Sequence, residues 1–439
     1  MVPVIDFLTS TWQGHILLII STHLITWGYT LWLGGWVSDD IEGIAKFSDR
    51  FLQQKDPQGN IIKEEKIDFY EVEEKKSDGK IEKRKIKNTG WNNQIEFPGC
   101  LLRWARIQWG RTFKKIGEDA KGHPVYGWVQ NPKKHHALNL LVQSANLILG
   151  YNLLSHLFGH NLAFLSMLFF AVHPCGVQCV GWISGVNYLF SLFGALVTFN
   201  LTLYISNLYI LLPLIALSSA FSCLTLLPGC LNFAILFLTG NINAGIVALI
   251  IGIVVLLRQG REVVNYRIKA FKEQQMGKST YIYWRKAIIM VKTFWYYVRI
   301  VIWPKRLGLF HTWGYHLDEP IEHIDFEFWA GVVALTGYTV LILHCPPPVQ
   351  FGLIWAFVYL LIFSNIITAQ QFVSERYCFI PTFGYCIAIA YYLQPYPVIS
   401  ALLIGLGIMR IWVHLPTFKN EVNFYESNFW NFPTSEVAM

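Results

Sequence analysis

Residues 15–36 read HILLIISTHLITWGYTLWLGGW, an apolar run without a single Lys, Arg, Asp or Glu. A helix that crosses a bilayer needs about 20 mostly apolar residues, so this run is long enough to cross. It is too long for the core of a signal peptide, and neither a preceding basic residue nor a small-residue cleavage site accompanies it. The sequence therefore predicts a retained first transmembrane helix within residues 1–36.

The composition of the whole chain agrees with a membrane protein. Hydrophobic residues make up 54% of the 439 residues and charged residues only 14%, against about 25% charged in a typical soluble domain. The 17 Trp suit the headgroup zone, where the indole ring finds one apolar and one wet side. The net charge of +7 does not indicate nucleic acid, because the excess Lys and Arg lie in loops between apolar runs.

Further apolar runs extend this pattern and predict an all-α polytopic membrane protein with about eleven transmembrane helices. The first helix (1–36) is followed by a long polar extracytoplasmic loop (37–135), a multi-span domain (136–415) and an extracytoplasmic tail (416–439). The expected spans lie near residues 15–36, 136–157, 161–177, 186–205, 206–227, 231–257, 286–303, 328–344, 349–368, 381–394 and 396–415.

The orientation follows from the charges of two short loops. Residues 258–286 carry eight basic and two acidic residues, which favours the cytoplasm, whereas residues 305–327 are mainly acidic and are expected outside. If 231–257 crosses once, counting from these loops places Asp39 and Glu375 together on the outer face. If it crosses twice, the two halves disagree by one face, so the single crossing is favoured.

The polar insert between the first two spans has two parts. Residues 63–87 mix Lys and Glu densely and predict a solvated excursion, although the alternation over 66–72 also permits a small β-ribbon. Residues 91–128 are rich in Trp and Arg, which suits an amphipathic helix on the membrane surface. The insert as a whole, 54–128, offers a docking surface for a protein partner.

The eight cysteines are scattered and mostly lie in or beside apolar segments. Cys175 and Cys179 are four residues apart, but no second pair has the spacing of a zinc site. A Cys in an apolar segment usually behaves as a small hydrophobic residue. The spacing therefore predicts neither a metal site nor a disulfide framework.

Asp39 and Asp40 directly follow the first span. On their own they are most simply acids that cap a helix in the loop, together with Ser38. A carboxylate at the interface can also act as a general base on an acceptor hydroxyl, and a neighbouring acid shifts its pKa towards a useful value. Both interpretations stay open on the residues alone.

A second polar group lies at Glu375 and Arg376, inside apolar sequence. The pair is either an ion pair at a helix end or a binding site in which the Arg376 guanidinium holds a phosphate. Lys305 and Arg306 are interfacial anchors that could serve the same anion, and His311 lies in the loop that follows them. His173 opens the polar segment 173–185, which ends one apolar run before the next begins.

Several motifs together resemble a known family. They are HALNLL at 136–141, LFG at 157–159, HP at 173–174 with WISG at 182–185, WP at 303–304, LGL at 307–309, ERYCFIPTFG at 375–384 and the tail from 412 to 435. Their order resembles the membrane domain of the transmembrane and tetratricopeptide-repeat O-mannosyltransferases and their bacterial relatives. The resemblance spans most of the chain except the insert.

This resemblance implies a C-type (GT-C) glycosyltransferase with a catalytic acid in its first extracytoplasmic loop and a sugar donor on a polyprenyl phosphate. Asp39 and Asp40 fall where that acid belongs, and Glu375, Arg376, His173 and Trp182 fall in the motifs that surround the substrate. The family usually carries His-Pro-x-His-x-Glu, whereas residues 173–178 read HPCGVQ, so a neutral Gln178 replaces the Glu. The charged residues that commonly follow the WISG motif are replaced as well.

Three functions remain after these observations. The leading one is inverting transfer of a sugar from a polyprenyl phosphate to a hydroxyl of a protein or glycan acceptor, at an extracytoplasmic or lumenal face. No cofactor is required for it, although an acidic pair also admits a divalent metal. The second is a non-catalytic scaffold or partner subunit that keeps the fold, and the altered motif favours it. A lipid-linked-sugar flippase ranks last, because the expected spans are mostly apolar.

Overall fold

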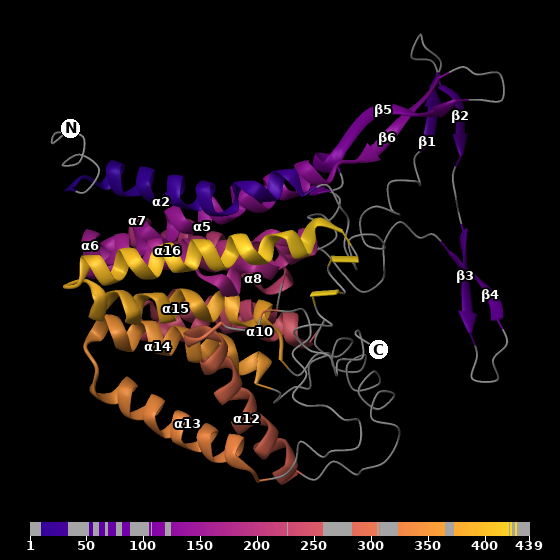
Figure 1. Ribbon diagram of the computed structural model, residues 1–439. Coiled ribbons are helices and arrows are strands. Elements are labelled where there is room, and N and C mark those ends of the chain that lie inside the picture. Colours follow the sequence, from indigo (N-terminus) through magenta and orange to yellow (C-terminus); the bar gives the residue numbers. More distant parts are fainter. Residues whose placement is uncertain are drawn as a thin grey trace. The chain divides into compact units, whose positions relative to one another are not determined.

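The structure is a computed structural model, and it forms two compact units. The helical unit comprises Met1–Gly35 with His136–Met439, and the insert unit comprises Trp36–His135. The described residues are 10–33, 52–55, 61–65, 69–75, 81–87, 105–106, 108–118, 124–225, 227–257, 283–304, 307, 324–364, 373–420, 422–423 and 426–427. Most of them are helical (Figure 1).

The main helices of the helical unit follow the expected apolar runs. They are α2 (Trp12–Trp27, continued by η1, Gly28–Trp32), α5 (Pro132–Phe158), α6 (His160–Ala171), α7 (Val186–Tyr204), α8 (Leu208–Thr225), α9 (Asn232–Leu238), α10 (Ile242–Val255), α12 (Tyr283–Ile302), α13 (Phe326–His344), α14 (Pro347–Leu360), α15 (Glu375–Leu393) and α16 (Pro397–His414). No Lys, Arg, Asp or Glu occurs in the sequence from 135 to 257, which contains α6 to α10.

Short connections between these helices are built from glycine and proline. Gly159 joins α5 to α6 at a φ of 91°, a left-handed conformation that costs a glycine little. Pro347 and Pro397 start α14 and α16, where the missing proline N–H is not needed.

Close helix packing depends on small residues. A Cβ on Gly384 of α15 would overlap the carbonyl oxygen of Gly352 of α14, so these backbones touch only because both residues are glycine. Ser191 of α7 and Ser222 of α8 each donate a hydrogen bond to the other's carbonyl, at 3.1 and 2.8 Å. Small residues at helix contacts are the usual means of association in a membrane.

Four helical segments among the described residues are long and apolar enough to cross a membrane. They are Pro132–Phe158, Ile183–Tyr204, Phe326–His344 and Pro397–Lys419. A bent pair, His160–Ala171 with Pro174–Gly181, makes a fifth if it is one span, with a bend of 55°. The chain is therefore a mostly helical protein with four to five helices of membrane-crossing length.

The stretch 231–257, expected to cross once, forms two short helices rather than one continuous helix. Gly240, at a φ of 77°, turns the chain between α9 and α10. A Cβ on Gly245 would meet the Phe237 ring, and one on Gly252 would meet the Cys230 carbonyl, so the two helices run antiparallel. The count of loop charges assigned the outer face on the assumption of one crossing at 231–257. A helical hairpin does not support that assumption.

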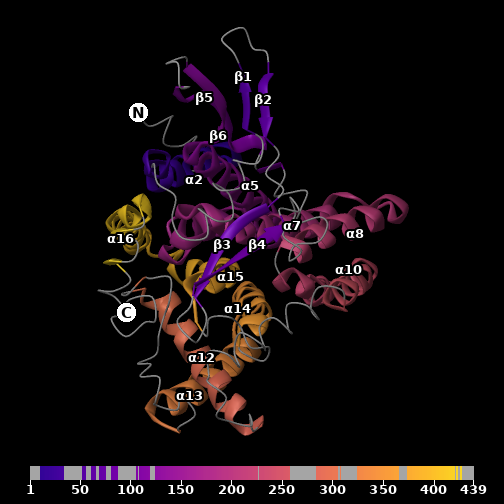
Figure 2. The same ribbon diagram turned by 90° about the vertical axis from the view of Figure 1, so that its right-hand side faces the viewer.

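The expected span at 286–303 also differs from a simple crossing. α12 carries four basic residues, Arg285, Lys286, Lys292 and Arg299, and is not among the segments of membrane-crossing composition. It is inclined to α14, α15 and α16, which Figure 2 shows nearly end-on while α12 is seen along its length.

The described parts of the insert unit are mainly strands. β1 (Leu52–Lys55), β2 (Ile61–Glu65), β5 (Arg111–Glu118) and β6 (Pro124–Gln130) form a sheet in the order β2-β1-β6-β5. β3 (Phe69–Lys75) pairs antiparallel with β4 (Ile81–Lys87), from Phe69 opposite Lys87 to Lys75 opposite Ile81. The ribbon permitted by the alternation over 66–72 is present. Of the amphipathic helix expected over 91–128, residues 105–106 and 108–110 are helical, β5 and β6 are strands, and the rest lies outside the described residues.

Candidate functional site

One end of the helical unit brings together segments that are far apart in the sequence. Trp27 of α2 donates its indole N–H to the carbonyl of Ala171 at 2.7 Å, and Trp412 of α16 donates to the carbonyl of Thr26 at 3.1 Å. The end of α12 and the start of α15 reach the same place, since Val301 contacts His173 and Glu375 contacts Gln178. We call this region the charged end and define it by residues 173–185, 374–376 and 410–419.

Glu375 is the first residue of α15 and is fully buried. Gln178 donates its Nε2 to Glu375 Oε2 at 3.2 Å, and Ser374 donates its hydroxyl to Gln178 Oε1 at 3.1 Å. A buried carboxylate needs such donors, and the positive end of the α15 dipole favours its charge. Gln178 thus joins the segment after α6 to the start of α15.

Arg376 lies beside Glu375 and faces aromatic rings. Its guanidinium carbon is 5.4 Å from the centre of the Trp182 ring and 5.6 Å from that of Tyr377. Asn139 of α5 donates to the Trp182 carbonyl at 3.0 Å, and the Tyr377 ring stacks on Phe363 at 4.2 Å. These contacts orient a permanently charged group by cation–π attraction.

His173 has both of its ring nitrogens engaged. Nδ1 accepts the backbone N–H of Cys175 at 3.2 Å, and Nε2 lies 3.2 Å from the carbonyl of Val301. A neutral ring with its proton on Nε2 satisfies both contacts, since Nδ1 must accept and a carbonyl needs a donor. His173 therefore ties the segment after α6 to the end of α12.

Sequence reasoning missed Arg410, which the structure places at the charged end. Its Nε donates to the Pro304 carbonyl at 3.2 Å, and its charge interacts with that of Glu375. The sequence did carry a signal for this residue, because Arg410 is the one Lys or Arg within α16. An ionisable residue inside an apolar helix is costly and usually has a partner or a function.

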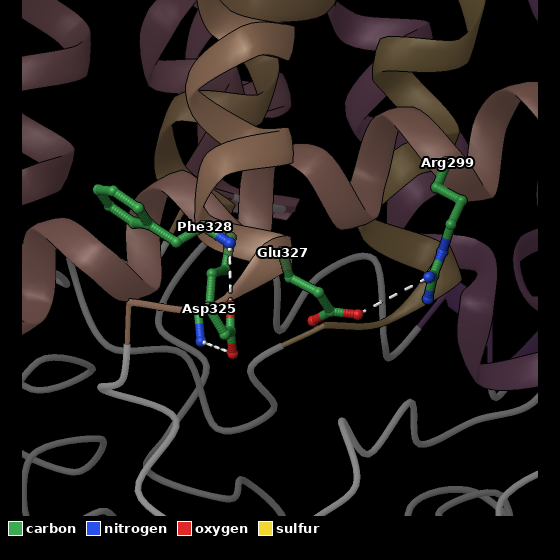
Figure 3. A network of polar contacts seen from close by, with 5 residues as sticks. Arg299, Asp325, Glu327 and Phe328 are labelled. Carbon is green, nitrogen blue, oxygen red and sulfur yellow. Dashed lines mark hydrogen bonds and ion pairs between the residues drawn. The ribbon is translucent and has the colours of Figure 1, made fainter.

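A second charged network joins α12 to α13 (Figure 3). Lys292, buried in the middle of α12, pairs with Asp325 Oδ2 at 2.5 Å, and Arg299 lies 3.8 Å from Glu327. Asp325 also caps α13, since its Oδ1 accepts the Phe328 N–H at 3.0 Å. Partial burial raises the pKa of Asp325, but the bonds from Lys292 and the Phe328 N–H outweigh it and leave that pKa below its ordinary value.

A row of buried polar residues on α5 was also missed: His136, Asn139, Gln143 and Asn146. Their spacing of three and four residues places them on one face of a helix, which is the signal that could have revealed them. Asn139 and Asn146 donate to the carbonyls of Trp182 and Leu189, so this face anchors the segment after α6 and the first turn of α7.

The structure therefore brings together five of the residues expected in the site: His173, Gln178, Trp182, Glu375 and Arg376. The other five, Asp39, Asp40, Lys305, Arg306 and His311, lie outside the described residues. The last turn of α2, which precedes Asp39 in the sequence, packs on the charged end, because a Cβ on Gly176 would lie 3.3 Å from the Trp27 ring.

Within the described ranges, no three His, Cys, Asp or Glu side chains group as metal ligands. Comparison of the chain with protein families, with curated proteins and with solved structures finds no match.

Proposed function

We propose that the protein is a membrane glycosyltransferase of the GT-C type that inverts the configuration of the transferred sugar. A carboxylate of Asp39 or Asp40 deprotonates an acceptor hydroxyl, whose oxygen attacks the anomeric carbon of a sugar carried on a polyprenyl phosphate. Arg376 stabilises the phosphate that leaves, with Lys305, Arg306 or His311 as further cations. Stabilisation of developing charge by a preorganised group is the largest contribution to many enzymatic rates.

The placement of Arg376 carries this proposal. A guanidinium binds phosphate through paired donors, and here it is held against Trp182 and Tyr377. The neighbouring carboxylate of Glu375 is bound to Gln178 and Ser374. The glycosidic attack itself needs no metal, because the leaving phosphate is neutralised by cations of the chain.

The replacement of Glu by Gln178 has a local physical reason. Gln178 Nε2 lies 3.2 Å from Glu375 Oε2, where a second carboxylate would repel the first. Two acids at that distance cannot both stay ionised. The neutral residue keeps the Glu375 charge intact, which supports a site adapted to a different acceptor rather than a lost one.

The same observations favour a second candidate, a non-catalytic scaffold or partner subunit. The ring nitrogens of His173 contact Cys175 and Val301, and the side-chain amide of Gln178 is hydrogen-bonded to Ser374 and Glu375. These contacts are structural. The scaffold would use the insert, 54–128, as a docking surface for a protein partner. The flippase remains the weakest candidate, since Asn139 and Asn146 of the polar α5 face donate to backbone carbonyls.

The two candidates separate in a transfer assay. The purified protein in lipid vesicles is given a radiolabelled polyprenyl-phosphate sugar and candidate acceptors, beside Asp39→Asn, Asp40→Asn and Arg376→Ala variants. The proposal expects transfer by the wild type, its loss in Arg376→Ala and its loss in one or both Asp variants. Unchanged transfer in both Asp variants removes their catalytic role, and a wild type inert with every donor favours the scaffold.

We further propose that the charged end faces the outside of the cell or the lumen of an organelle. This placement rests on the family resemblance. An N-glycosylation acceptor appended to the C-terminus tests it in a eukaryotic host, because the sequon is modified only on the lumenal side. Modification is expected, and an unmodified tail that is cleaved by protease on the cytoplasmic side contradicts the placement.

A further inference from the structure

Two buried thiols face one another where α8 turns into α9. Cys223 lies near the end of α8, and Cys230 lies in the short helix η7 (Leu227–Leu231); they are exposed by only 1% and 2%. Both are free thiols in the structure, and their side chains pack in one buried apolar cluster with Val255 of α10. Nothing in the proposed transfer reaction uses this pair.

The surrounding backbone fixes the approach of the two residues. A Cβ on Gly229 would overlap the backbone of Ser222 and Cys223, so the chain returns directly onto the end of α8. A Cβ on Gly252 would meet the carbonyl of Cys230 at 2.7 Å, so α10 closes the opposite side. The backbone therefore brings residues 229–230 directly beside Cys223, and a disulfide requires such a close approach of its two residues.

Other buried thiols of the helical unit differ in their contacts. Cys175 donates to the Ile300 carbonyl at 3.8 Å, and Cys179 donates to the Arg376 carbonyl at 3.9 Å. A thiol that donates to a carbonyl is satisfied in its reduced form, whereas Cys223 and Cys230 lie together in one buried apolar cluster.

We propose that Cys223 and Cys230 form a disulfide bond that staples the end of α8 to η7. The bond forms by exchange with the disulfide of an oxidoreductase: the two thiols lose two protons and two electrons, the sulfur–sulfur bond closes, and the reagent leaves as a dithiol. Because the folded pair is buried, this exchange takes place during folding.

The pair lies towards the charged end, since Ser222 bonds to Ser191 in the second turn of α7, the helix that starts beside Gly185. Disulfides persist in the secretory pathway and the periplasm but not in a reducing cytosol. The proposed disulfide therefore rests on the same extracytoplasmic or lumenal placement of the charged end as the proposed function. It rests on no other part of that proposal.

Thiol trapping in cells tests the bond on the full chain. Cells are lysed in denaturant with N-ethylmaleimide, and the protein is digested with chymotrypsin, because residues 135–257 contain no Lys or Arg. We expect a peptide that contains Cys223 linked to Cys230, lighter by two hydrogen atoms than the dithiol and alkylated only after reduction. Alkylation of both residues in the unreduced wild type overturns the proposal.

Two variants serve as controls. Cys345→Ser should leave the linked peptide unchanged, because Cys345 contacts Tyr392 elsewhere. Cys230→Ser should make Cys223 fully alkylated. Sugar transfer measured on the same wild-type preparation keeps the two proposals apart: a linked but inert protein argues against the transferase alone, and an active protein with free thiols argues against the disulfide alone.

Discussion

The two ends of the helical unit differ in whether their polar groups are neutral or charged. At one end, which we call the turn end, helices are joined by Gly159 and by residues 205–207, 345–346 and 394–396, none of which is charged. Tyr151 lies 3.1 Å from both His15 and His160 there, and Tyr204 donates to Asn152 at 2.7 Å. The charged end instead holds Glu375, Arg376 and Arg410.

The difference in charge between the two ends indicates which of them can hold a polar ligand. Short turns with few polar groups only need to connect helices, and neutral hydrogen bonds close them. The charged end bears the desolvation cost of ionised groups, which is tolerated in a membrane helix only where partners or a ligand compensate it. The difference supports the proposal that the charged end binds a polar ligand, whereas the turn end connects helices.

The largest effect should come from Arg376. Arg376→Ala removes the cation proposed for the leaving phosphate and should lower kcat/KM for sugar transfer by about 10²–10³-fold. Arg376→Lys keeps the charge but loses the paired donors and should recover only part of the rate. At the turn end, Tyr392→Phe should transfer sugar at the wild-type rate; an equal loss in both variants would erase the distinction between the ends.

The next effect concerns the helix pair α14–α15 that connects the two ends. Gly384→Ala places a methyl group on the Gly352 carbonyl and should lower the free energy of unfolding by about 1–3 kcal/mol. Gly337→Ala in α13 is the control, since nothing lies within 4 Å of its Cβ position. Thermal unfolding in detergent should show a lower Tm for the first variant and an equal or higher one for the second.

A similar effect is expected at Glu375. Glu375→Ala leaves Gln178 without its acceptor and should cost about 1–3 kcal/mol of stability. Glu375→Gln keeps an acceptor oxygen and should retain most of that stability. Sugar transfer by Glu375→Gln then shows whether the charge itself serves the reaction: a stable variant with wild-type transfer would make Glu375 a purely structural residue.

The smallest effect should come from the pair of Lys292 and Asp325. Because bonding lowers the pKa of Asp325 in the folded protein, its contribution is complete above the ordinary pKa of an aspartate, about 3.9, and disappears as the pH falls through the lowered value. Half of the Asp325 side chain is exposed, so Asp325→Asn should cost only about 1 kcal/mol. The difference in Tm from the wild type should be constant from pH 5 to 8 and shrink in stronger acid; a constant difference at every pH would exclude the ion pair.

Apolar runs in the sequence located nearly every helix, because lipid imposes a simple requirement of length and hydrophobicity. At 231–257 the apolar sequence left one or two crossings open, since both α9 and α10 are apolar and only Gly240 marks the turn between them. The strands β5 and β6 were taken for a helix because Trp and Arg are frequent in both. Periodicity alone could not decide between these states.

Parts of the site were also predictable. Glu375, Arg376 and the segment from His173 to Gly185 stood out as polar residues in apolar surroundings, and the structure joins them through Gln178. The partner roles were not predictable, because the contacts of Gln178 and Arg410 bridge residues far apart in the chain. Arg410 was visible as a lone charge in α16, but its neighbour Pro304 was not.

Photocrosslinking of a polyprenyl-phosphate analogue tests whether the lipid phosphate binds at the charged end. The wild-type protein in lipid vesicles is irradiated with an analogue whose photoreactive group is attached next to the phosphate, and the modified peptides are mapped by mass spectrometry. Adducts are expected in residues 173–185 and 374–376, and an unlabelled lipid phosphate should compete them away and Arg376→Ala should weaken them. Adducts at Gly159 and residues 394–396 that the unlabelled lipid phosphate competes away, with none at the charged end, would contradict binding at the charged end.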